Sequence, residues 1–249
     1  MRIGEVELGK IPVVIGTLSG NIEHPVEIVN KIDLFELRID TFKTQEVAYI
    51  TGIIHSLKRV YGKPLLATVR SKVEGGAVEI DDDRRYEIYK EVLPLVDAVD
   101  VELSSAGLLK RVLPLCREKE KVLIASYHNH DETPGERQLE KLVSDGKEIG
   151  ADIVKIAVTA NSKEDLSRLI SFTIKNRDKG LITISQGSIG TISRIVTPIL
   201  GSLMTYGYID VPSAKGQLSA FEIVDYFKLF DPAYRDSKDV SISCHSRSV

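Results

Sequence analysis

The sequence predicts one α/β fold, a (β/α)8 TIM barrel with an N-terminal β-hairpin. Short apolar runs alternate with amphipathic helical stretches along the chain, and the alternation repeats eight times. Strands separated by single helices pair in parallel, and eight such units close into a barrel. The length of 249 residues is typical of one barrel of this kind.

The elements follow in order from the N-terminus. Residues 2–8 and 13–18 have an extended pattern and are joined by a short turn that contains Pro12, which predicts a hairpin or a strand pair. A short helix is expected near Val26. The next strands are expected at residues 34–40, 65–70, 98–103, 122–128, 153–158, 181–185 and 204–209. Helices are expected at residues 45–61, 83–93, 106–119, 136–149, 163–179, 191–200 and 217–229.

No strong linker interrupts residues 1–230, so they are expected to form a single catalytic barrel domain. Residues 231–249 lie outside the eight units and end in a serine-rich stretch. For this C-terminal tail a disordered end, an extra packing segment and added non-native sequence all remain open.

Composition narrows the class of partner. Hydrophobic residues make up 43% and charged residues 28% of the chain, and the net charge is −3 with both signs mixed throughout. These values predict a protein with a full core and argue against a nucleic-acid or membrane partner. There is no signal-like start and no uninterrupted apolar stretch of transmembrane length, so a cytoplasmic location is expected. Cys116 and Cys244 are expected to be free thiols without metal-ligand spacing.

On five of the expected strands the polar side chains stand at alternate positions, so they lie on one face of the strand. Residues i and i+2 of a strand point to the same face, so each of these strands presents one polar and one apolar face. Five strands that direct charges into one lumen are hard to explain as isolated structural groups, because buried charges must pair with each other or with a ligand. The inward residues are Glu36, Arg38, Thr68, Arg70, Asp100, Glu102, Ser126, His128 and Lys155.

Lys155 lies in a buried strand pattern and shares its face with Ile153 and Ala157. Burial among apolar groups removes hydration from an ammonium and favours the neutral amine, which can attack a carbonyl. The alternative is a lysine near a strand end whose side chain extends to water.

Three loops add candidates at the same end of the barrel. Gly75 and Gly76 allow a backbone path that brings Glu74 over the barrel mouth. After the seventh strand a glycine-bearing loop could bind a phosphate, or Arg194 could bind a carboxylate. After the eighth strand, Ser213 and Gln217 supply a hydroxyl and an amide.

Taken together, these motifs resemble those of the type I 3-dehydroquinate dehydratases. The motifs are Glu36-Leu-Arg38, Arg70 with Glu74-Gly-Gly76, Ser126-Tyr-His128 with Thr133-Pro134, Lys155-Ile-Ala157, Ile192-Ser-Arg194 and Ser213-Ala-Lys-Gly-Gln217. They stand in the same order on the corresponding strands, from about Val13 to Leu229.

The resemblance implies the dehydration of 3-dehydroquinate to 3-dehydroshikimate in the shikimate pathway, without a metal or an organic cofactor. It implies that Lys155 forms a Schiff base with the C3 ketone, that His128 is the general acid and base, and that Glu74 orients His128. It further implies that Arg194 pairs with the substrate carboxylate and that the chain forms a homodimer. The remaining substrate-binding residues would be Glu36, Arg38, Arg70, Ser213 and Gln217.

The sequence departs from the family pattern at three places. A serine common near the end of the first strand is absent, and Gly16 and Thr17 stand there with Ser19 beyond. A methionine often found after the seventh strand is replaced by Ile184 or Gln186, and Tyr206 stands where phenylalanine is frequent.

Parts of the pattern also fit three other functions. The pair His128 and His130 at a strand end suggests a metal-dependent hydrolase, but further ligands are hard to find. A Schiff-base aldolase would need a phosphate cradle after the seventh strand, where Arg194 favours a carboxylate. A non-catalytic metabolite-binding barrel is the third alternative.

Overall fold

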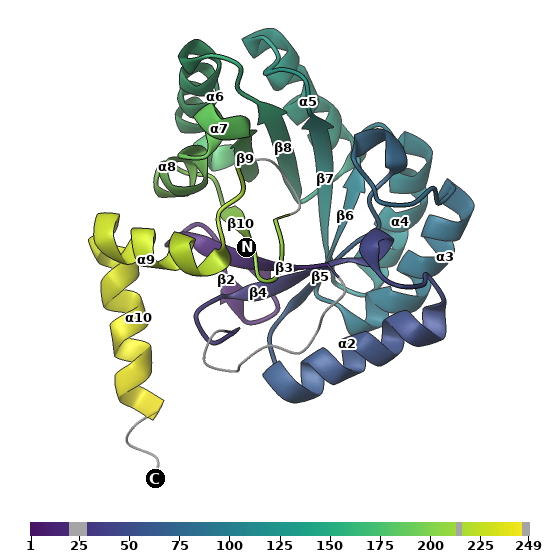
Figure 1. Ribbon diagram of the computed structural model, residues 1–249. Coiled ribbons are helices and arrows are strands. Elements are labelled where there is room, and N and C mark those ends of the chain that lie inside the picture. The colour runs from purple at the N-terminus through teal and green to yellow at the C-terminus, as the bar shows by residue number, and fades with distance from the viewer. Residues whose placement is uncertain (20–28, 213–215, 246–249) are drawn as a thin grey trace.

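The computed structural model describes residues 1–19, 29–212 and 216–245, with side chains described as far as Lys238 in the last helix. Eight parallel strands form one sheet in the order β10-β3-β4-β5-β6-β7-β8-β9. Helices lie outside the strands (Figure 1). The (β/α)8 barrel predicted from the sequence is therefore confirmed.

The strands of the barrel are β3 (Val13–Leu18), β4 (Leu34–Arg38), β5 (Leu65–Thr68), β6 (Ala98–Glu102), β7 (Val122–Asn129), β8 (Ile153–Thr159), β9 (Leu181–Gln186) and β10 (Met204–Tyr208). The α-helices around them are α2 (Val47–Tyr61), α3 (Asp82–Val92), α4 (Ala106–Glu118), α5 (Glu136–Ile149), α6 (Lys163–Lys175), α7 (Gly187–Gly190), α8 (Ser193–Ile199), α9 (Ala220–Phe230) and α10 (Pro232–His245). Short 3-10 helices are η1 (Ile39–Thr41), η2 (Lys72–Glu74), η3 (Leu93–Leu95) and η4 (Arg177–Lys179). The helix expected near Val26 lies outside the described residues.

The N-terminal hairpin differs in detail from its prediction. β1 (Arg2–Ile3) and β2 (Val6–Glu7) pair antiparallel with each other. β3 joins the barrel instead and pairs in parallel with β4 and β10. The six residues of β3 are all buried, whereas β1 and β2 are partly exposed, so β3 has the burial of a barrel strand.

Side-chain parity divides the core into two parts. Outward-facing residues such as Leu37, Val99 and Val154 pack under the helices. Inward-facing residues near the strand starts, among them Leu34, Ile124 and Ile153, fill the lower lumen with apolar side chains. The inward positions further along the same strands are polar, so the site rests on a packed apolar floor.

The seam between β9 and β10 is held by side chains rather than by a regular ladder. The carbonyl of Leu181 accepts a hydrogen bond from the Leu203 amide, but the next groups along β9 bond to hydroxyls. The Thr183 amide donates to Ser202 Oγ at 3.0 Å, and Thr197 Oγ1 donates to the Thr183 carbonyl at 2.8 Å. The Ser185 amide donates to Ser193 Oγ at 2.8 Å. These buried hydroxyls satisfy backbone groups that a paired strand would otherwise take.

The segment after the eighth unit forms α10, which continues from α9 at the edge of the molecule (Figure 1). Tyr234 of α10 is fully buried, and its ring lies 5.2 Å from that of Phe227 of α9. Lys238 forms an ion pair with Asp33, whose other oxygen accepts a hydrogen bond from the Val14 amide. Helix α10 is thus attached both to α9 and to the residues beside β3 and β4.

Candidate active site

One polar pocket opens at the carboxyl ends of the strands, where barrel enzymes carry their catalytic groups. Most of the side chains that line it are polar or charged, which suits a small ligand with several polar substituents. Eight of the nine site residues predicted from the sequence line it: Glu36, Arg38, Arg70, Glu74, His128, Lys155, Arg194 and Gln217. Ser213, the ninth, lies outside the described residues.

Lys155 is buried, with 4% of its surface exposed. Along its own strand it is flanked by apolar residues, as predicted, but its neighbours across the barrel are charged. Its Nζ lies 3.0 Å from Asp100 Oδ2 and 3.9 Å from Glu36 Oε1, over the ring of Tyr206 at 4.1 Å from the centroid. The apolar setting expected for the amine is therefore incomplete, because a carboxylate faces it directly.

Asp100 connects this lysine to the inward arginine of β5. Its Oδ1 accepts hydrogen bonds from Arg70 Nη2 at 3.0 Å and from Ser126 Oγ at 2.5 Å. Burial alone would raise the pKa of Asp100, but Arg70 and Lys155 outweigh it and hold the pKa at about 2. Asp100 is therefore ionised at neutral pH.

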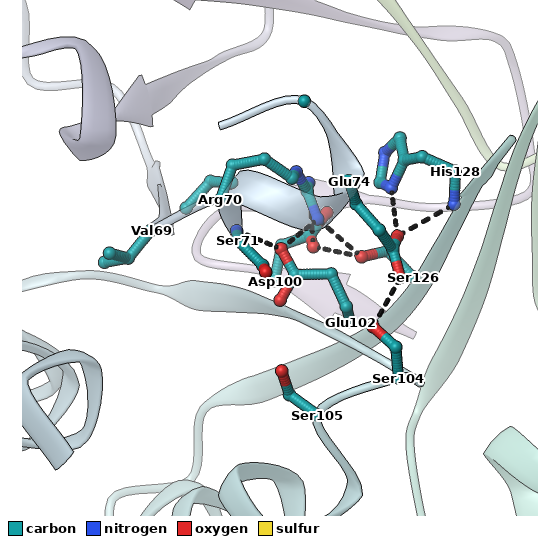
Figure 2. Close-up of polar contacts among 12 residues, drawn as sticks. Val69, Arg70, Ser71, Glu74, Asp100, Glu102, Ser104, Ser105, Ser126 and His128 are labelled. Atoms are coloured by element: carbon teal, nitrogen blue, oxygen red, sulfur yellow. Dashed lines mark hydrogen bonds and ion pairs between the residues drawn. The ribbon is translucent and has the colours of Figure 1, made fainter. Parts of the chain in front are cut away.

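Arg70 is itself fully paired with acidic residues. Its Nη1 donates to Glu102 Oε1 at 2.8 Å and to Ser126 Oγ at 2.9 Å (Figure 2). The other oxygen of Glu102 pairs with Arg85 of α3, which is also buried. A chain of alternating charges thus runs from α3 to the amine of Lys155, and each buried charge in it has a partner.

His128 is held by Glu74 at the pocket mouth. Glu74 Oε2 accepts a hydrogen bond from the His128 amide at 2.9 Å and lies 3.0 Å from its Nδ1, while Ser104 Oγ donates to Oε1 at 2.5 Å (Figure 2). The contact to Nδ1 leaves Nε2 as the ring nitrogen available for proton transfer. Burial, and then the charges of Arg70, Lys155 and Arg38, lower the pKa of His128 well below its usual value. The imidazole is therefore neutral near pH 7.

The glycine pair gives the loop carrying Glu74 the path that the sequence suggested. Gly75 has a φ of +88°, and the Gly76 amide donates to the Ser71 carbonyl at 2.9 Å. A Cβ on Gly76 would lie 2.3 Å from the Arg70 carbonyl oxygen. The loop thus folds back on the end of β5 and places Glu74 against His128.

Two of the predicted binding residues already have partners. Arg38 makes a two-point contact with Asp40, whose oxygens lie 3.0 Å from Nε and 2.8 Å from Nη2. Glu36 accepts hydrogen bonds from Thr17 at 3.0 Å and Thr68 at 2.9 Å. Thr17 lines the pocket at the end of the first barrel strand, where the sequence lacks the expected serine.

Arg194 lies on α8 and is 2% exposed. Its Nη1 donates to the Tyr206 carbonyl at 2.8 Å, but its Nε is buried without a hydrogen-bond partner. No carboxylate among the described residues pairs with it. Burial lowers the pKa of Arg194 to about 10, which still leaves it charged at neutral pH. A buried guanidinium whose Nε has no partner among the described residues is suited to bind a ligand carboxylate.

Sequence reasoning missed several residues that line the pocket or contact its residues. Asp100 had the correct inward parity, but nothing along the chain showed that it meets Lys155. The sequence suggests His130 only as a metal ligand, but its Nδ1 lies 3.0 Å from Gln186 Oε1 and its Nε2 lies 3.4 Å from the Glu74 carbonyl oxygen. In the described part of the chain, no three His, Cys, Asp or Glu side chains are placed to hold a metal ion. None of the helices described is long and apolar enough to span a membrane.

A buried amine, a neutral imidazole and an arginine without a carboxylate partner among the described residues surround one pocket, which indicates an enzyme of the (β/α)8 class for a small carbonyl acid. The chain belongs to the type I 3-dehydroquinase family, whose family model matches residues 10–232. A 3-dehydroquinate dehydratase from Thermodesulfovibrio yellowstonii is 39% identical over 207 residues, which are 82% of this chain and 88% of that protein.

Solved structures agree with the family match. The type I 3-dehydroquinate dehydratase of Clostridium difficile, solved with covalently modified comenic acid, has a TM-score of 0.81 and 28% identity and covers 91% of this chain and 96% of its own. The 3-dehydroquinate dehydratase of Aquifex aeolicus has a TM-score of 0.78 and 34% identity, and the match covers 88% of this chain and 99% of that chain.

Proposed function

We propose that this chain converts 3-dehydroquinate to 3-dehydroshikimate through a Schiff base on Lys155. The dehydration itself follows from membership of the family. The observation that carries the proposed mechanism is that the buried Lys155 and the unpaired Arg194 line one pocket together with a Glu74-bound His128. A ligand with both a ketone and a carboxylate would satisfy the amine and the guanidinium at once.

Lys155 would attack the C3 ketone and, after loss of water, form an iminium. Before the attack Lys155 must be neutral; the neutral His128 can take its proton, whereas Asp100, with a pKa of about 2, cannot. Asp100 would instead remain as the counter-ion of the iminium, at the position where it now faces the amine. The iminium withdraws electrons and makes the proton on C2 easier to remove.

His128 would then remove the C2 proton, and the electron pair left behind would form an enamine. Collapse of the enamine expels the C1 hydroxyl, which takes a proton from His128 and leaves as water. Hydrolysis of the conjugated iminium returns the free lysine and the enone. Glu74 would fix the ring of His128 through both the amide and Nδ1, so that Nε2 serves both proton transfers.

Arg194 would hold the carboxylate on C1, and Glu36, Arg38, Arg70, Ser213 and Gln217 would bind the ring hydroxyls or support the groups that do. The pairing of Arg38 with Asp40 and of Arg70 with Asp100 and Glu102 supports a positioning role for these two arginines. The unpaired edge of Arg194 supports direct contact with substrate.

The test is to incubate the protein with 3-dehydroquinate and sodium borohydride and then map the modified peptide by mass spectrometry. We expect a stable adduct on the peptide that carries Lys155 and loss of activity in proportion to it. Lys155→Ala should give no adduct, while Lys175→Ala, which changes an exposed lysine on α6, should behave like the parent. A folded parent protein that turns over substrate without any adduct would refute the Schiff base.

We also propose that the protein is a cytoplasmic homodimer with residues 1–230 as its catalytic barrel and a small molecule, not nucleic acid, as its partner. The dimer rests on the family resemblance, and the mixed charge with a net value of −3 argues against a nucleic-acid partner. Light scattering during gel filtration tests the dimer, for which a mass of one chain would be contrary evidence.

A further inference from the structure

The hydroxyl of Tyr206 is a buried polar group without a hydrogen-bond partner among the described residues. Tyr206 lies on β10, and 4% of its surface is exposed. Such a hydroxyl lowers the stability of a folded protein, because its bonds to water are lost and not replaced. A phenylalanine would fill the same space without that cost, so the hydroxyl requires an explanation.

Tyr206 lies next to both groups proposed to hold the substrate. The Lys155 Nζ lies over its ring at 4.1 Å from the centroid. Its backbone carbonyl accepts the hydrogen bond from Arg194 Nη1. Among the residues that line the pocket, Tyr206 and Arg194 are the two with a buried polar side-chain atom that has no partner in the described part of the chain.

The hydroxyl keeps its proton under working conditions. Burial first, and then the carboxylates of Glu36 and Asp100, raise the pKa of Tyr206 well above its usual value. A protonated phenol is a hydrogen-bond donor, and it is suited to an oxygen that gains negative charge.

We propose that the Tyr206 hydroxyl donates a hydrogen bond to the oxygen on the substrate carbon that Lys155 attacks. This inference rests on the proposed role of Lys155. As the Nζ–C3 bond forms, the C3 carbonyl becomes a carbinolamine hydroxyl; that oxygen then takes a proton from His128 and leaves as water when the C3–O bond breaks. Tyr206 keeps its own proton throughout and stabilises the oxygen at each stage.

The position of the amine places the site of attack close to Tyr206. Lys155 lies over the tyrosine ring while it is paired with Asp100. To reach a carbonyl carbon the amine must move from its place between Asp100 and the Tyr206 ring, so the attacked carbon and its oxygen come to lie beside that ring. The ligand then supplies the acceptor that the protein lacks.

The test compares Tyr206→Phe with Tyr234→Phe. Tyr234 is a matched control, because its hydroxyl is also buried without a described partner but lies on α10, away from the pocket. Without ligand, both variants should melt about 2–4 °C higher than the parent, since each loses an unsatisfied hydroxyl. A lower melting temperature for Tyr206→Phe would mean that the hydroxyl is already satisfied, and this would overturn the proposal.

With substrate, the two variants should differ. We expect kcat/KM to fall about tenfold in Tyr206→Phe, as for the loss of one transition-state hydrogen bond, and the rate of borohydride trapping to fall in parallel. Tyr234→Phe should match the parent in both. If Tyr206→Phe keeps the parent's kinetics while the parent is trapped on Lys155, this inference fails and the Schiff base stands; if the parent is not trapped, the Schiff base itself fails.

Discussion

At the scale of single residues, Asp100 is the group on which the charge balance of the site depends. It pairs with Lys155 and Arg70 at 3.0 Å each, so removal of its charge leaves the buried Lys155 without its nearest anion and leaves Arg70 with Glu102 alone. Leaving a buried charge uncompensated costs about 3–5 kcal/mol.

Asp100→Asn keeps the shape of the side chain and removes its charge. We expect kcat to fall about 100-fold, because the iminium loses its counter-ion, and the free energy of unfolding to fall as well. Asp152→Asn is the control, since Asp152 accepts a hydrogen bond from the Leu123 amide at the opposite end of the strands and touches no site residue named above. Steady-state kinetics and urea unfolding measure both effects; an unchanged kcat in Asp100→Asn would exclude the counter-ion role.

The lowered pKa of His128 predicts a pH profile. Activity requires the neutral imidazole, and the acidic limb of kcat/KM reports the protonation of the free enzyme's base. The pKa of an unperturbed histidine is about 6.5. Because burial and nearby cations lower the pKa of His128, the acidic limb should lie below that pH.

Removal of one nearby cation should raise the limb. Arg38→Gln is expected to move it to higher pH, whereas Arg84→Gln, which changes a partly exposed arginine on α3, should leave it in place. A limb at or above pH 6.5 in the parent would contradict the neutral state assigned to His128.

The sequence could predict which residues point into the lumen, but not all of their partners. Parity along each strand was enough to place Glu36, Arg70, His128 and Lys155 on the inner face. The contact between Lys155 and Asp100 crosses from β8 to β6, and it depends on the stagger of the strands around the barrel, which no local pattern contains.

At the scale of elements, the loop that contains η2 decides whether Glu74 reaches His128. Gly76 is packed so closely that an added Cβ would lie 2.3 Å from the Arg70 carbonyl oxygen. Gly76→Ala must therefore shift the loop. We expect kcat to fall at least tenfold, because small displacements of catalytic groups are costly.

Gly52→Ala is the matched control for this change. Gly52 lies inside α2, where a Cβ would meet no heavy atom within 4 Å. Alanine there should raise the free energy of unfolding by up to about 1 kcal/mol and leave kcat unchanged. If Gly76→Ala also kept full activity, the loop would be more tolerant than its packing indicates.

Most strands and helices could be predicted from periodicity, and the irregular pieces could not. β7 and α5 lie within a residue of their expected bounds, because their apolar spacing is regular. Residues 187–199 form two short helices, α7 and α8, instead of one from residue 191, with Gly187 at a φ of +80° where α7 begins. Such breaks follow from glycine geometry and tertiary contacts, which periodicity does not report.

At the scale of the whole molecule, α10 is a packed part of the structure. Tyr234 is fully buried against Phe227, so Tyr234→Ala would leave a cavity between the last two helices. The free energy of unfolding should fall by about 3–5 kcal/mol, as for other large aromatic deletions in cores.

The kinetic constants of Tyr234→Ala should equal those of the parent, because no residue of α10 whose side chain is described lines the pocket. Arg235→Ala, on the same helix with an exposed side chain, should change neither stability nor kinetics by a measurable amount. Urea unfolding of the two variants gives the comparison, and equal stabilities would mean that α10 contributes little to the fold.

Because no regular ladder of backbone hydrogen bonds joins β9 to β10, we expect the barrel to be least rigid between these two strands. Every other pair of neighbouring strands is held by backbone hydrogen bonds, so a deformation of the barrel should occur most easily between β9 and β10. Here the gap is filled by the hydroxyls of Ser193, Thr197 and Ser202, and Arg194 crosses to the carbonyl of Tyr206 beside it. A carboxylate bound to Arg194 would hold this side chain in place between α8 and β10. Binding of substrate would therefore also make the barrel more rigid between β9 and β10.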